Sequence, residues 1–128
     1  MATRQQVRKA VGDALDSIDG VRGHAYTPGQ VNPPAVVVIE VDVSFDATMQ
    51  RGADDFTVLC RAMTGGDLRA AQDKLDEIVS TVKAELDGDL DGTVHFARVS
   101  RIRGDTEGQI EVGGSTFAVI DFEIEVVA

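Results

Sequence analysis

The last stretch of the chain, Ser115 to Val127, alternates between apolar and acidic residues. Because successive side chains of a β-strand point to opposite faces, its apolar residues share one face of a sheet: Ala118, Ile120, Phe122, Ile124 and Val126. The acidic residues share the other face: Asp121, Glu123 and Glu125. Gly113-Gly114 separates this stretch from residues 109–112, a two-residue spacing typical of a hairpin. The chain therefore builds a sheet with one buried face and one face that meets water or a partner.

Two segments carry apolar residues at the spacing of a helical face. We expect the first helix to begin after an N-cap at Thr3 and to end near Gly20, and the second to begin after a cap at Asp67. The first apolar stripe comprises Val7, Val11, Ala14, Leu15 and Ile18. The second, which extends over about five turns, comprises Leu68, Ala71, Leu75, Ile78, Val79, Val82 and Leu86.

Apolar and β-branched runs predict further strands, at 21–26, 35–43, 55–63 and 93–103. Polar connections are expected at 27–34, 44–54 and 104–109. The order of helix, three strands, helix and three strands favours an α+β fold, a mainly antiparallel β-sheet packed by two α-helices. A chain of 128 residues predicts one domain, 1–128.

The charge balance limits the partners. Asp and Glu outnumber Lys and Arg by 22 to 12, for a net charge of -10, which repels a phosphate backbone or an anionic bilayer. Aromatic residues make up 5%, too few for a base-stacking platform. Residues 1–20 hold no apolar block of the length of a signal peptide or membrane span, so we expect no membrane contact and a cytoplasmic place of synthesis.

Residues suited to nucleophilic catalysis are few. Cys60 lies in an apolar run and, as the single cysteine, cannot form an intramolecular disulfide. His24 and His95 are the two histidines, each in a predicted strand. Either histidine could approach Cys60, but the pattern favours core or surface positions for all three over a catalytic dyad. No phosphate-binding glycine motif is present.

An acidic cluster follows the second helix. Asp87, Asp89 and Asp91 alternate and precede Gly92, as in the first half of a calcium-binding loop. Arg98 occupies the position at which such a loop needs a bidentate glutamate. We therefore favour a helix end at Gly88 and a solvated acidic turn over a calcium site.

The basic residues concentrate in the strand predicted at 93–103. Arg98, Arg101 and Arg103 lie there, and Arg101 and Arg103 share one face of the strand. They can pair with Glu123 or Glu125 across the sheet, or with acidic groups of a neighbouring subunit. This pattern favours a self-paired, solvated face over a nucleic-acid patch.

Several segments together resemble a known family in their order and spacing. They are Ile18-Asp19-Gly20-Val21-Arg22, His24-Ala25-Tyr26, Val31-Asn32-Pro33-Pro34 with the valines after it, Arg51-Gly52-Ala53-Asp54 before Phe56-Thr57-Val58, residues 69–76, and Glu111-Val112-Gly113-Gly114. The family that they resemble is that of the small tail terminator and head-tail joining proteins of long-tailed (siphovirus-type) bacteriophages, especially those of actinobacterial hosts. The resemblance extends over almost the whole chain, and none of these segments is a catalytic motif.

The resemblance implies a non-enzymatic, tail-terminator-like α+β subunit of the virion. It implies a homo-oligomeric ring, a hexamer, that caps the tail tube and joins it to the neck. The implied partners are further copies of the chain, the tail tube protein and a neck or head-completion protein. Genomic DNA would pass through the lumen without specific binding, and the protein would be assembled in the host cytoplasm into the tail-neck junction of the virion.

The residues that we expect at interfaces are chosen for their positions in loops and on the basic strand: Gln30, Val31, Asn32, Arg51, Arg101 and Arg103. No catalytic, cofactor-binding or metal-binding residues are expected. Two other interpretations stay open. The chain can be another neck, head-closure or tail-completion protein of the same particle, or a small ligand-binding α+β domain with a polar pocket.

Overall fold

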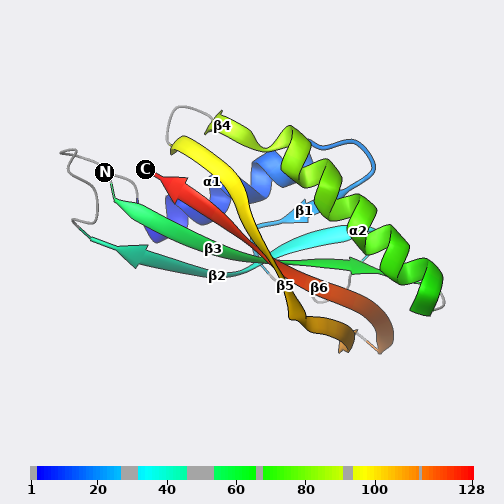
Figure 1. Ribbon diagram of the computed structural model, residues 1–128. Helices are drawn as coiled ribbons and strands as arrows, with labels where there is room; N and C mark the ends of the chain where they lie inside the picture. Colours follow the sequence, from blue (N-terminus) through cyan, green and yellow to red (C-terminus); the bar gives the residue numbers. More distant parts are fainter. Residues whose placement is uncertain (1–2, 27–31, 46–53, 66–67, 91–93, 113) are drawn as a thin grey trace.

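The computed structural model describes residues 3–26, 32–45, 54–65, 68–90, 94–112 and 114–128 (Figure 1). Two helices and six strands follow one another as α1 (Arg4–Asp16), β1 (Arg22–His24), β2 (Ala35–Ser44), β3 (Asp55–Thr64), α2 (Leu68–Glu85), β4 (Asp87–Leu90), β5 (Val94–Val112) and β6 (Ser115–Val127). The predicted order is confirmed as far as the second helix and for the last strand, whereas the predicted strands 93–103 and 109–112 are one strand, β5, and β4 was not predicted.

The six strands form one twisted sheet in the order β1-β2-β3-β6-β5-β4. β1 pairs with β2 in parallel, and every other neighbouring pair is antiparallel. β5 and β6 run side by side as a long hairpin that bends at its far end (Figure 1). The predicted α+β class, a mainly antiparallel sheet packed by two helices, is therefore confirmed.

Helix α1 begins after an N-cap at Thr3, as the sequence predicts, and the cap is a full capping box. The Thr3 hydroxyl accepts a hydrogen bond from the Gln6 amide at 3.2 Å, and the Gln6 side chain accepts one from the Thr3 amide at 2.8 Å. The helix then packs against β1 so closely that a methyl group added at Gly23 would lie 2.3 Å from the Asp16 backbone nitrogen. Glycine is thus required where α1 meets β1.

Both helices cover the same face of the sheet. α1 contacts β1, β2 and, less extensively, β4, whereas α2 contacts β3, β5 and β6. The main core between helices and sheet contains buried apolar residues of both helices and of β2, β3, β5 and β6, with Leu90 of β4 partly buried against it. It includes the predicted stripes from Val7 to Ile18 and from Ala71 to Leu86, and the alternating residues of β6. The even-numbered residues of β6 that alternation places inward are confirmed as buried: Ala118, Ile120, Phe122, Ile124 and Val126.

The opposite face of the sheet is divided into two parts. One part is a smaller buried apolar cluster made by Ala35, Val37, Met63, Phe117 and Val119. The other part carries the charged side chains of β3, β5 and β6, which are described below. Residues 117–122 of β6 are consequently buried on both faces.

The acidic segment after α2 is a strand rather than the predicted turn. Helix α2 ends at Glu85, and Asp87–Leu90 pairs with β5 as strand β4, with Asp87 opposite Arg98. Gly88 takes a positive φ of 98° where the register shifts, which is the backbone conformation of a glycine bulge. The prediction failed because the antiparallel pairing with the next strand, β5, overrides the low strand propensity of Asp and Gly.

The polar segment 104–108 is likewise not a turn between strands, because β5 runs without interruption from Val94 to Val112. Its register against β6 shifts between Arg103 and Gly108. The Thr106 hydroxyl bridges this bulge: it donates to the Arg103 carbonyl at 2.7 Å and accepts from the Asp121 amide at 3.0 Å. These side-chain bonds replace ladder bonds, so the strand continues through a sequence that resembles a turn.

Candidate protein-interaction surface

A row of arginine–carboxylate pairs crosses β5 and β6 on the sheet face opposite the helices. The register places Arg98 opposite Glu125 and Arg101 opposite Glu123. Arg98 Nη2 lies 3.1 Å from Glu125 Oε2, and Arg101 Nε lies 3.5 Å from Glu123 Oε2. The predicted cross-strand pairing of Arg101 with Glu123 is confirmed.

A one-residue bulge brings Arg98 and Arg101 to the same face. Residues three apart in a regular strand point to opposite faces, but the register shifts between Val99 and Arg101 and leaves Ser100 as the extra residue. The Ser100 hydroxyl donates to the Glu123 carbonyl at 3.3 Å, which fixes the bulge. Both arginine side chains are more than half exposed, at 58% and 66%.

Asp121 lies between two arginines in the register, with Arg61 of β3 on one side and Arg103 of β5 on the other. Arg61 binds it with both prongs of the guanidinium, Nε to Oδ1 at 2.7 Å and Nη2 to Oδ2 at 3.1 Å. The hydrogen bond to Asp121 raises the pKa of Arg61 above its ordinary value, despite the opposing effect of burial. Arg103 Nη2 lies 3.9 Å from Asp105 Oδ2, and its buried Nε has no hydrogen-bond partner among the described residues.

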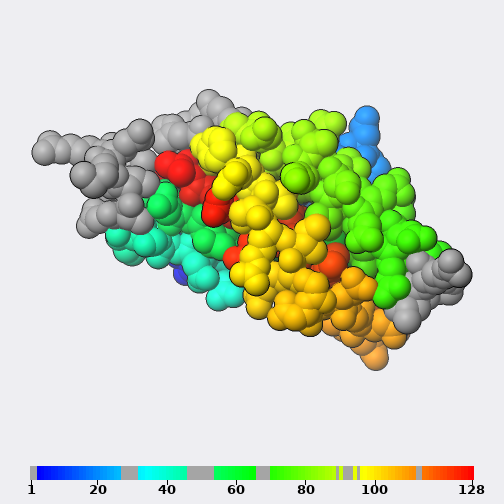
Figure 2. All heavy atoms as spheres, in the orientation of Figure 1, coloured from blue at the N-terminus to red at the C-terminus, as the bar shows by residue number. Residues whose placement is uncertain are grey.

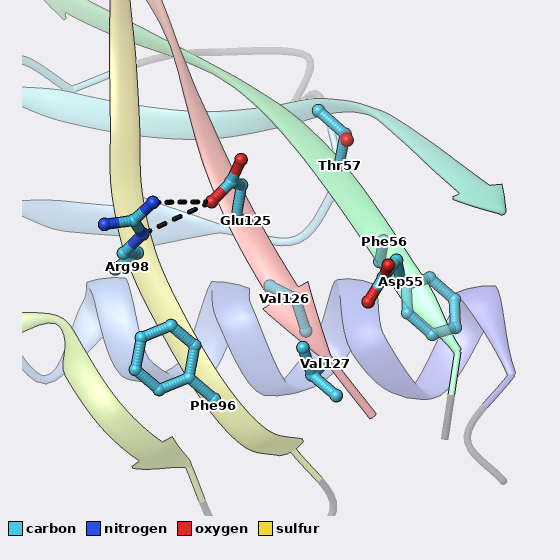
Figure 3. Close-up of a pocket in the computed structure, with 8 residues that line it drawn as sticks. All are labelled: Asp55, Phe56, Thr57, Phe96, Arg98, Glu125, Val126 and Val127. Carbon is cyan, nitrogen blue, oxygen red and sulfur yellow. Dashed lines mark hydrogen bonds and ion pairs between the residues drawn. The ribbon is translucent and has the colours of Figure 1, made fainter. Parts of the chain in front are cut away.

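A shallow hollow of about 440 Å³ lies where the beginnings of β3 and β5 meet the end of β6 (Figure 3). Figure 3 shows Arg98 and Glu125 reaching toward each other above it, with the Phe96 ring on β5 opposite the end of β6. Phe96 is 41% exposed, which is unusual for a large aromatic residue on a sheet. The hollow is lined by Asp55, Phe56, Thr57, Phe96, Arg98, Glu125, Val126 and Val127.

Among the side chains that the structure describes, the cysteine and the histidines do not form a catalytic dyad. Cys60 is fully buried, and burial raises the pKa of its thiol far above the ordinary value of 9.0, so the thiol stays protonated. His24 lies on β1, where its buried Nε2 has no hydrogen-bond partner within the described part of the chain. The side chain of His95 lies outside the described residues.

The expected interface residues fall in different places. Arg101 and Arg103 lie on β5, and Asn32 is an exposed residue before β2, which β3 and β6 separate from β5. The structure therefore groups Arg101 with Arg103 but does not bring Asn32 to them. Gln30, Val31 and Arg51 lie outside the described residues.

The acidic cluster is not assembled into a cation site in the described ranges. Among the residues that the structure describes, no group of three or more His, Cys, Asp or Glu side chains is placed to hold a metal ion. Asp87 belongs to β4, whereas the Asp89 side chain and Asp91 are outside the described part.

Sequence reasoning missed two components of the charged face. The Arg61–Asp121 pair joins residues 60 positions apart, and its one sequence signal is a basic residue in one strand and acidic residues in the other. Phe96 was missed because an isolated phenylalanine in a predicted strand is ordinarily a core residue.

This arrangement of exposed arginines, carboxylates and an aromatic ring is suited to binding another protein, because arginine and aromatic residues are enriched at protein interfaces. Neither helix described by the structure is long and apolar enough to span a bilayer. No protein-family model matches the chain, and no curated protein matches it.

Proposed function

We propose that this chain is a structural protein of a bacteriophage virion, a tail terminator. In this role, copies of the chain form a ring, a hexamer, that caps the tail tube and joins it to the neck or head-completion protein. The proposal starts from the sequence resemblance described above. Its structural support is the charged sheet face, where the exposed arginine and glutamate side chains are accessible to a partner protein.

The observation that carries the proposal is the row of exposed ion pairs beside Phe96. An exposed pair such as Arg98–Glu125 contributes only about 0–1 kcal/mol to the stability of the free subunit. Its groups can therefore exchange partners at low cost when a second protein brings its own charges. The exposed Phe96 ring supplies an apolar anchor for such a contact, and the hollow next to it, lined by both apolar and charged residues, leaves room for a side chain of the partner.

The net charge of -10 is compatible with a ring through which DNA passes. An acidic wall repels the phosphate backbone and lets the genome slide without sticking. A lumen lined by basic side chains would contradict this part of the proposal.

Size-exclusion chromatography with light scattering tests the proposal at micromolar concentration, with and without purified tail tube protein. We expect a particle of several times the 13.6 kDa subunit mass, and tube ends that carry the chain. The variant Phe96→Glu replaces the exposed aromatic ring at the hollow with a charged side chain and should reduce binding to the tube or the ring, whereas Arg22→Glu on β1 serves as the control. A protein that stays monomeric and ignores tubes would contradict the proposal.

A further inference from the structure

The two edges of the sheet differ in whether other groups bind their free backbone N–H and C=O groups. At the β1–β2 edge, helix α1 takes the free backbone groups: Arg4 Nε donates to the Val41 carbonyl at 2.7 Å and Arg8 Nη1 to the Val38 carbonyl at 3.3 Å. The Asp16 carboxylate accepts from the Gly23 amide at 3.1 Å. α1 therefore closes this edge against strand addition.

The edge on the other side is open. β4 pairs with β5 over Val94–Arg98, while β5 continues to Val112, and no described strand pairs with that remaining part of its outer edge. Figure 2 shows β5 (yellow to gold) uncovered beside α2 (green). An edge strand left in this way presents backbone N–H and C=O groups to any chain that arrives extended.

Side chains next to this open edge differ between its two faces. On the helix face, Val99 and Ile102 form a groove of about 340 Å³ with Val79 and Lys83 of α2. Ile102 is 51% exposed in this groove. The other face carries Arg98, Arg101 and Arg103 with no acidic residue among residues 98–103.

The pairing of β5 with β6 indicates which sequence pattern suits a strand that pairs with β5. On its inner edge, β5 pairs with β6, which places Glu123 and Glu125 against the arginines and Phe122 and Ile124 on the helix face. Both edges of β5 share the same side chains, so they favour the same complementary pattern. That pattern is an extended segment in which acidic and apolar residues alternate.

We propose that the open edge of β5 at residues 99–103 binds an extended, acidic segment of a partner protein by strand addition. The backbone of the segment pairs with β5, its acidic side chains face Arg101 and Arg103, and its apolar side chains enter the groove with Ile102 and Val79. This inference rests on the proposed function insofar as both need a protein partner, and it names the edge and the chemistry of that partner.

A peptide that copies Asp121–Val127, with acetylated and amidated ends, is a probe of the required chemistry. Titration of the full chain with this peptide, followed by amide hydrogen exchange, should show added protection of those amides within 99–103 that point away from β6. A peptide with lysine in place of both glutamates should bind at least about tenfold more weakly, because it meets the arginines with like charge. Equal binding of the two peptides, or binding without protection of these amides, would overturn the proposal.

Variants of the chain give a second readout. Arg101→Glu and Ile102→Lys alter exposed side chains and should each weaken peptide binding by about tenfold or more. Arg22→Glu makes the same charge change at the closed edge and should leave binding unchanged. If both β5 variants bind as the unaltered chain does, the edge is not the site.

Light scattering on the same samples separates this inference from the proposed function. Rings without peptide protection would overturn the inference and leave the proposed function standing. Peptide protection in a protein that never forms rings would overturn the proposed function and leave the inference standing. If the 99–103 amides become protected as the protein alone is concentrated, a second copy occupies the edge and the acidic partner segment is wrong.

Discussion

Arg61 on β3 and Asp121 on β6 face each other in the register of the sheet and form a two-pronged ion pair, with Nε to Oδ1 at 2.7 Å. The Asp121 side chain is 4% exposed and that of Arg61 27% exposed, so the pair is shielded from solvent far more than the neighbouring Arg98–Glu125 pair. Asp121 also fixes the β5 bulge, since its amide donates to Thr106. One residue thus links β3, β6 and β5.

Replacing Asp121 by alanine should destabilise the chain by about 2–4 kcal/mol, because it leaves the Arg61 guanidinium half-buried without its partner. Glu125→Ala, which breaks an exposed pair on the same face, should cost less than about 1 kcal/mol. Urea denaturation of both variants measures the difference. Equal losses would show that burial does not distinguish the two pairs.

Thr106→Val tests the bridge across the bulge. The variant keeps the shape of the side chain but removes the hydroxyl that joins the Arg103 carbonyl and the Asp121 amide, and we expect a loss of about 1–2 kcal/mol. Thr116→Val at an exposed position of β6 is the matched control and should change stability by less than about 0.5 kcal/mol. Hydrogen exchange should accelerate at the Asp121 amide in the first variant alone; unchanged exchange there would argue against the bridge.

Gly23→Ala tests the close contact of α1 with β1. The new methyl group would meet the Asp16 nitrogen at 2.3 Å, so α1 must move, and we expect a loss of about 3 kcal/mol or more. At Gly104 a methyl group meets open space, so Gly104→Ala should stay within about 0.5 kcal/mol of the unaltered chain. Thermal unfolding of the two variants gives the comparison, and similar melting temperatures would refute the contact.

The buried Cys60 thiol predicts a specific pH dependence. Burial raises the pKa of Cys60 in the folded chain, so the stability that its protonated form contributes is complete below the ordinary value of 9.0. Above pH 9 the unfolded chain ionises and the folded chain does not, so unfolding becomes easier by about 1.4 kcal/mol per pH unit from this group. Cys60→Ala should lack this component of the slope, which urea titrations between pH 8 and 10 measure; identical slopes would contradict the assignment.

The sequence predicts those elements whose burial follows a local period. The stripe from Ala71 to Leu86 defines α2, and alternation defines β6, because in each case one covered face repeats at the spacing of the element. β4 is different: Asp87–Leu90 has the composition of a turn and is a strand only because Arg98 and its neighbours pair with it. The composition of residues 87–90 alone does not show that the next strand folds back and pairs with them.

The contacts of the charged face likewise differ in whether the sequence can predict them. The pairing of Arg101 with Glu123 was predictable, since both lie in strands with a clear alternation and opposite charges favour cross-strand positions. The Arg61–Asp121 pair required knowledge that β3 and β6 are neighbours, although they are far apart in the chain. The open edge of β5 depends on where β4 stops pairing, which no local pattern encodes.

Electron cryo-microscopy of the intact virion to which we assign this chain in the proposed function tests the central claim most directly. The account predicts density for the two-helix, six-strand subunit, repeated around a ring at the end of the tail tube where the tail meets the neck, with acidic side chains toward the lumen. A particle whose tail-neck junction is filled by other proteins and holds no copy of this subunit would contradict it.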